Sequence, residues 1–109
     1  MISDQGESAS VRDAGGALTA EDAEKLIAAW LKSYLSDLLR IPTDQIDEEM
    51  AFQRYGLDSS SAVGMAGDLG AWLGCEVDSA APYDFPSIRA LSQELARQDD
   101  ARATLARMR

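Results

Sequence analysis

The feature that most constrains the fold of this chain is a run of apolar side chains between residues 26 and 38. They recur at intervals of three and four residues, which is the spacing of one face of an α-helix: Leu26, Ile27, Trp30, Leu31, Tyr34, Leu35 and Leu38. Thr19, with Asp22 three residues later, has the form of a capping box. Pro42 disfavours a helix immediately before it. We therefore predict an amphipathic helix over residues 20–39, whose apolar face needs other elements to cover it.

Two later segments repeat this helical spacing. The first covers residues 59–74 and ends at Gly74, since glycine commonly follows the last turn of a helix; its apolar residues are Ala62, Val63, Met65, Ala66, Leu69, Trp72 and Leu73. The second covers residues 87–98 and has a narrower stripe of Ile88, Leu91 and Leu95. A short helical turn is predicted near residues 79–85, and no segment alternates as a strand would. The sequence therefore predicts an all-α, four-helix bundle with three main helices and one short helix.

A long connection over residues 40–58 joins the first two helices. Its apolar side chains are expected to pack onto the core: Ile41, Ile46, Met50, Phe52, Tyr55 and Leu57. Gly56 is expected to form a turn before the second helix. Residues 1–18 are rich in Ser, Gly, Asp and Glu, which predicts a disordered leader. Residues 97–109 carry four arginines against two aspartates. We expect one domain over residues 19–96 and then a basic tail, either a frayed helix extension or a linker or docking segment.

Three glycines lie inside the second predicted helix: Gly64, Gly67 and Gly70. Each weakens a helix by about 1 kcal/mol relative to alanine, so their presence needs a reason. Close approach of another helix is one interpretation, and a surface kept small for a partner is another. A phosphate-binding glycine loop is disfavoured, because the spacing is wrong and no lysine follows.

Composition excludes several classes of function. The net charge of −9 argues against nucleic acid binding, and the absence of histidine excludes a Ser-His-Asp triad within this chain and a histidine metal site. Cys75 is the single cysteine, so it has no partner for an internal disulfide and no histidine to activate its thiol. We therefore expect a chain that is not an enzyme by itself and that has no metal site.

The same composition bears on location and partners. No apolar run is long enough to span a membrane, and the N-terminus lacks the features of a secretory signal. We expect a cytoplasmic monomer without a membrane or nucleic acid partner. Its acidity either attracts partners with basic patches or only keeps the protein soluble.

The stretch YGLDSSSAVG, residues 55–64, sets three serines at the start of the second helix. One interpretation is structural: Asp58 or Ser59 caps the helix by accepting hydrogen bonds from N–H groups of the first turn. A second interpretation, a serine nucleophile, lacks a nearby base. The third is modification by another enzyme, because a phosphoester at a helix N-terminus meets N–H groups and the positive end of the helix dipole. The residues alone leave the first and third interpretations open.

The run FQRYGLDS, residues 52–59, is followed by AV and later by LGAWLG, and it resembles the attachment motif of acyl carrier proteins. It is most similar to carrier domains of bacterial modular polyketide synthases. The run YDFPSI, residues 83–88, is similar to the family's pattern around its third and last helices. The resemblance covers residues 21–95. It implies a small helical bundle that carries intermediates in polyketide or fatty acid-type biosynthesis and does not catalyse their conversion.

The resemblance also implies site residues. Ser59, directly after Asp58, would receive 4′-phosphopantetheine from coenzyme A through a separate magnesium-dependent phosphopantetheinyl transferase. The thiol of this arm would hold acyl groups as thioesters for partners such as a ketosynthase, an acyltransferase or an acyl-adenylate ligase. The implied docking surface consists of Leu57, Asp58, Ser60, Val63 and Gly64.

Two residues depart from the family pattern. Ser60 stands where leucine is usual, and Asp68 is the only charged residue between Ser59 and Gly74. The alternative function is a non-covalent helical docking or regulatory module, in which the serines only cap a helix.

Overall fold

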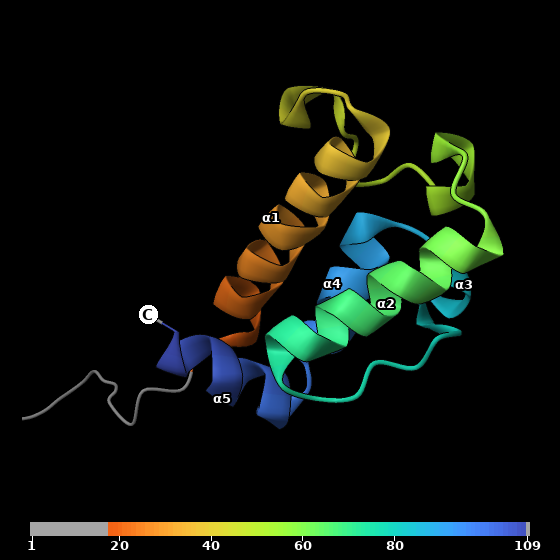
Figure 1. Cartoon of the computed structure of the whole chain (residues 1–109). Coiled ribbons are helices and arrows are strands. Elements are labelled where there is room, and N and C mark those ends of the chain that lie inside the picture. Colours follow the sequence, from red (N-terminus) through yellow and green to blue (C-terminus); the bar gives the residue numbers. More distant parts are fainter. Residues whose placement is uncertain (1–17, 109) are drawn as a thin grey trace, which may run out of the picture.

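The computed structural model describes residues 18–108, and they form a bundle of helices (Figure 1). Residues 1–17 of the leader predicted over residues 1–18 lie outside the described residues, whereas its last residue, Leu18, is buried. The elements in chain order are α1 (Ala20–Leu39), the 3-10 helices η2 (Thr43–Gln45) and η3 (Phe52–Tyr55), α2 (Ser59–Leu73), α3 (Ala81–Asp84), α4 (Ile88–Ala96) and α5 (Asp99–Arg107). The α4 helix packs along α1, and α5 contacts α1, α2 and α4. This arrangement confirms the all-α bundle with a long connection between its first two helices.

The α1 helix has the bounds that its sequence signals predict. The Thr19 Oγ1 accepts a hydrogen bond from the backbone N–H of Asp22 at 3.1 Å, and the helix ends at Arg40, which takes the left-handed conformation with a φ of 60°. Its buried residues are Ala23, Ile27, Ala28, Leu31 and Leu35. The predicted stripe is wrong at its edges, because Leu26 and Leu38 remain 38% and 45% exposed. Ala23 and Ala28 are small and buried, so neighbouring elements pack closely against them. The buried face of α1 is therefore slightly rotated from the face that the larger apolar side chains predict.

The α2 helix ends at Gly74, where a φ of 66° favours glycine. Its glycines have different surroundings. A Cβ added at Gly70 would lie 2.9 Å from the backbone oxygen of Cys75, so the segment after α2 folds back tightly against the helix. A Cβ added at Gly67 would meet nothing within 4 Å. Close packing therefore explains Gly70, although its neighbour is this returning segment and not another helix, and it does not explain Gly67.

The connection between α1 and α2 packs onto the core as its apolar residues predict. Ile46 and Phe52 are buried. The N–H of Phe52 donates to the oxygen of Pro86 at 2.7 Å, directly before α4. Gly56 makes the expected turn, with a φ of 84°. This connection is therefore fixed to the rest of the bundle and delivers the chain to the start of α2 in one defined direction.

The described part of the tail is an additional helix that packs into the core. Ala101 and Leu105 of α5 are buried, and the guanidinium of Arg102 donates to the oxygen of Ala96 at the end of α4 at 2.8 Å. Leu18 is buried in the same core. The core thus extends past both edges of the predicted 19–96 region, whose limits as a domain stay a prediction.

Within residues 18–108, no helix combines the length and the apolar character needed to cross a membrane.

Candidate functional site

The three serines lie at the N-terminus of α2, where Asp58 is the capping residue. The Asp58 Oδ1 accepts a hydrogen bond from the N–H of Ser61 at 2.8 Å, and the backbone oxygen of Asp58 accepts one from Ala62 at 2.9 Å. The structural interpretation is therefore confirmed for Asp58. Ser59 is the first residue of the helix and not its cap.

The side chain of Ser59 is open to solvent. Ser59 and Ser60 are exposed, whereas Ser61 is half-buried. Within the described part of the chain, the hydroxyl of Ser59 has no protein hydrogen-bond partner. Its backbone N–H and that of Ser60 belong to the first turn, where a helix provides no backbone acceptors. An accessible hydroxyl thus lies beside N–H groups that are able to bind an anion.

Hydrogen bonding keeps the Asp58 carboxylate ionised. The backbone N–H of Ser61 is the main cause that holds the pKa of Asp58 below its ordinary value, and the hydroxyl of Ser61 adds to the effect. A carboxylate with a lowered pKa is a poor general base at neutral pH. Asp58 therefore stabilises the helix start but is weakly suited to activate the neighbouring serine.

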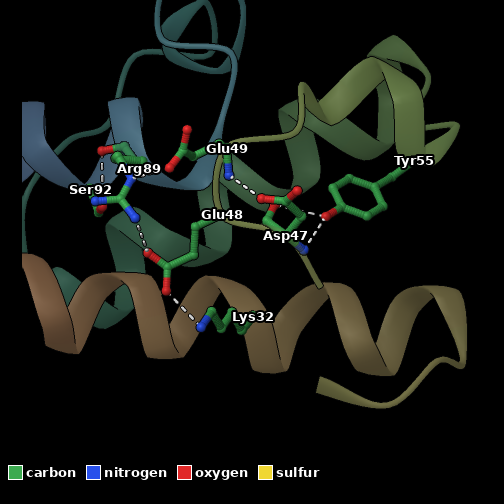
Figure 2. A network of polar contacts seen from close by, with 7 residues as sticks. All are labelled: Lys32, Asp47, Glu48, Glu49, Tyr55, Arg89 and Ser92. Atoms are coloured by element: carbon green, nitrogen blue, oxygen red, sulfur yellow. Dashed lines mark hydrogen bonds and ion pairs between the residues drawn. The ribbon is translucent and has the colours of Figure 1, made fainter. Parts of the chain in front are cut away.

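A network of polar contacts holds the segment that leads to these serines (Figure 2). The Tyr55 hydroxyl accepts a hydrogen bond from the N–H of Asp47 at 2.6 Å and donates one to the Asp47 oxygen at 2.8 Å. Glu48 pairs with Lys32 of α1 at 2.6 Å and with Arg89 of α4 at 3.6 Å. The sequence analysis missed this network, because nothing in the local spacing of these residues indicates which helices the connection touches.

The five residues of the expected docking surface lie on the turn before α2 and on its first two turns. Leu57 is half-buried, and the others are exposed: Asp58, Ser60, Val63 and Gly64. Val63 is 47% exposed. The structure thus brings these residues together around Ser59.

The exposed face of α2 carries little charge. Its single charged residue, Asp68, accepts a hydrogen bond from the Tyr34 hydroxyl of α1 at 2.9 Å. Burial is the main cause that raises the pKa of Tyr34, and Asp68 raises it further. The ring of Trp30 stacks on Tyr34 and on Trp72, with ring centroids 5.1 and 5.5 Å apart. These contacts fix α2 against α1 and keep the one carboxylate of this face engaged within the protein.

Other chemistry has little support in residues 18–108. In this part of the chain, no group of three or more His, Cys, Asp or Glu residues is arranged to hold a metal ion. Burial raises the pKa of the Cys75 thiol, and Asp100 adds to the effect. Since the thiolate is the nucleophile, a raised pKa lowers the reactive fraction of this cysteine at neutral pH. The exposed serine beside a capped helix is the remaining chemical feature.

Comparison with known families shows which family the chain belongs to. The profile of the family described as "Phosphopantetheine attachment site" matches residues 29–95. This chain belongs to the phosphopantetheine attachment family. The carrier is 39% identical over 79 residues to "Acyl carrier protein TtuC" of Teredinibacter turnerae, with 72% of this chain and 86% of that protein covered. These matches make it an acyl carrier protein or domain with a phosphopantetheine attachment site, and they give no support to a docking module without a prosthetic group.

Polyketide synthases contain related carrier domains. The carrier is 33% identical over 76 residues to "Spectinabilin polyketide synthase system protein NorC" of Streptomyces orinoci, and the match covers 69% of this chain but only 3% of that protein. The carrier therefore corresponds to one small part of such a synthase.

Solved structures agree with the helical fold. A free-standing peptidyl carrier protein from Acinetobacter baumannii is 28% identical, with a TM-score of 0.64 and coverage of 68% of this carrier and 92% of that chain. The HMG-ACPI domain of the CurA module from Lyngbya majuscula has a TM-score of 0.67 at 20% identity, with 87% and 94% of the two chains covered. At that identity the second likeness concerns the fold alone.

Proposed function

We propose that Ser59 is the residue of this carrier that bears 4′-phosphopantetheine, and that the loaded protein presents acyl intermediates to the enzymes of a polyketide or fatty acid-type pathway. The observation that carries the proposal is the division of roles at the start of α2. Asp58 caps the helix through Ser61, while the hydroxyl of Ser59 is exposed and takes no part in the cap. Ser59 also directly follows the aspartate, as the attachment motif requires.

The transfer needs groups that this chain does not supply. The Oγ of Ser59 would form a bond to the phosphorus that bears the pantetheine portion of coenzyme A. The bond between that phosphorus and the bridging oxygen breaks, and the adenosine bisphosphate leaves with the electron pair. The serine proton passes to a base of a separate, magnesium-dependent phosphopantetheinyl transferase, because this chain has no histidine and Asp58 is a poor base.

The start of α2 fits a phosphodiester. The N–H groups of Ser59 and Ser60 are not used by the helix, and the positive end of the helix dipole favours a negative charge there. The attached group supplies a flexible arm whose terminal thiol forms thioesters. The chain's own part is to hold the root of that arm at the exposed end of a helix that is fixed to the bundle.

The docking surface surrounds this serine. We assign it to Leu57, Asp58, Ser60, Val63 and Gly64, which are grouped at the start of α2. Val63, with 47% of its surface exposed, offers an apolar contact on this face of α2. The net charge of −9 favours encounter with basic enzyme surfaces. The expected partners are the transferase and enzymes of the ketosynthase, acyltransferase or acyl-adenylate ligase type.

The proposal is tested by intact mass after incubation with coenzyme A, magnesium and a phosphopantetheinyl transferase of broad specificity. The wild-type chain should gain one phosphopantetheine, and Ser59→Ala should gain none while keeping its helical circular dichroism, because Asp58 still caps α2. Ser61→Ala, which lies outside the assigned docking surface, is the matched control and should gain one group. Loading of Ser59→Ala would move the site to another serine, and no loading of a folded wild-type chain would contradict the proposal.

A further inference from the structure

The Tyr55 hydroxyl adds a side-chain anchor to the segment before Ser59, which is also held by the buried Phe52 and by the bond from its N–H to the oxygen of Pro86. A tyrosine hydroxyl is able to donate and to accept a hydrogen bond at once, and Tyr55 does both toward the backbone of Asp47 (Figure 2), at 2.8 and 2.6 Å. These two bonds close the irregular connection between residues 47 and 55 into a loop. They also satisfy the backbone N–H of Asp47, whose oxygen additionally accepts the N–H of Met50 at 3.2 Å.

The residues next to Asp47 attach this loop to two helices. Glu48 pairs through its side chain with Lys32 of α1 at 2.6 Å, and its backbone oxygen accepts the N–H of Arg89 of α4 at 2.9 Å. The guanidinium of Arg89 lies 3.6 Å from Glu48 and 3.6 Å from Glu49. The Asp47 carboxylate accepts the N–H of Glu49 at 2.8 Å. The position of Asp47 is therefore fixed, because Ile46 before it is buried and Glu48 after it is bonded to two helices.

Tyr55 connects the fixed residue Asp47 to the proposed attachment site. Only three residues separate it from Ser59. The first, Gly56, is in the left-handed conformation with a φ of 84°, which a glycine leaves easily unless its neighbours are held. Leu57 is half-buried against the core, and Asp58 caps α2. The anchored hydroxyl thus limits the directions in which the flexible glycine is able to present the exposed serine.

We infer that Tyr55 is a positioning residue for the attachment reaction: its hydroxyl, held by the backbone of Asp47, sets the turn that presents Ser59 to the transferase. The inference rests on the proposed attachment at Ser59. Without the hydroxyl, the turn samples several arrangements and only a fraction of the folded molecules is competent to bind. When only a fraction of the carrier molecules is competent to bind, the apparent dissociation constant for the transferase equals the intrinsic constant divided by that fraction.

The test is the kinetics of phosphopantetheine transfer to Tyr55→Phe, with the carrier as the varied substrate. The variant keeps the half-buried ring and loses only the hydroxyl. We expect the KM for the carrier to rise roughly five- to a hundredfold and kcat to change little, as the loss of two ordinary hydrogen bonds implies. Tyr34→Phe is the matched control, since it also loses a hydrogen-bonded hydroxyl but lies outside the turn. Its KM should stay close to that of the wild type.

A second variant tests whether the attachment of the loop to α1 and α4 contributes to the same effect. Glu48→Gln weakens the attachment of the loop to Lys32 and Arg89, and it should raise the KM in the same direction by a smaller factor. An unchanged KM in Tyr55→Phe, an equal rise in Tyr34→Phe, or a fall in kcat alone would overturn the inference. Failure of the wild-type chain to load would overturn the attachment at Ser59 itself, whereas normal loading of wild type and Tyr55→Phe alike would overturn only the positioning role.

Discussion

At the scale of single residues, the start of α2 separates two roles that the sequence alone leaves mixed. The run of one aspartate and three serines is compatible with either Asp58 or Ser59 as the cap, because both residue types are good N-caps. The structure gives the cap to Asp58 through the N–H of Ser61. Which residue accepts this bond depends on where the first turn begins, and that is set by Gly56 and by the anchored connection before it.

The ionised form of Asp58 is predicted to contribute to stability in a pH-dependent way. Its pKa in the folded chain lies below the ordinary value of 3.8. The contribution is therefore present above that value and is lost as the pH falls through the lowered pKa. In urea unfolding at neutral and acidic pH, wild type should lose more stability toward acid than Asp58→Asn, which is able to cap without a charge. An equal loss of unfolding free energy toward acidic pH in wild type and Asp58→Asn would contradict this account.

At the scale of elements, α1 and α2 were predictable because residues typical of helix ends flank them in the sequence. Thr19 begins α1 and Gly74 ends α2, and both residues have the expected cap geometry. The helix α5 was less clear, since its buried face consists only of Ala101 and Leu105 among charged neighbours. Such a short stripe gives almost no periodic signal. The returning segment that requires Gly70 was also hidden, because a close backbone approach depends on tertiary structure.

The glycines of α2 give a paired prediction. Gly67→Ala should stabilise the protein by about 0.5–1 kcal/mol, because the added Cβ meets nothing within 4 Å and alanine is the better helix former. Gly70→Ala should destabilise it by about 1–3 kcal/mol, since its Cβ would lie 2.9 Å from the Cys75 oxygen. Urea denaturation measures both effects. Equal shifts of the two variants in one direction would show that α2 does not pack as described.

The helix α5 is predicted to be part of the folded unit. Leu105 is 1% exposed, so Leu105→Ala should lower the free energy of unfolding by about 2–5 kcal/mol. Met108, on the same segment, is 49% exposed, and Met108→Ala should change it by less than about 0.5 kcal/mol. Thermal or urea unfolding of the two variants provides the comparison. Similar, small effects would mean that the tail frays and does not close the bundle.

At the scale of the whole molecule, Ser59 and the described part of the tail lie at opposite ends of α2. The family match ends at residue 95, and α5 follows it, with Thr104 beside Gly74 at the end of α2 opposite Ser59. The fold class and the family were predictable because helical spacing and the motif at residues 52–59 are both local. The network that joins Glu48 to two helices was not, because it links positions far apart in the sequence.

The most direct test of the central claim is to locate the attached group within the loaded chain. Cleavage after arginine releases one peptide, residues 55–89, that contains all three candidate serines. Fragmentation of this peptide by mass spectrometry should assign a single phosphopantetheine to Ser59. Assignment to Ser60 or Ser61 would contradict the division of roles at the start of α2.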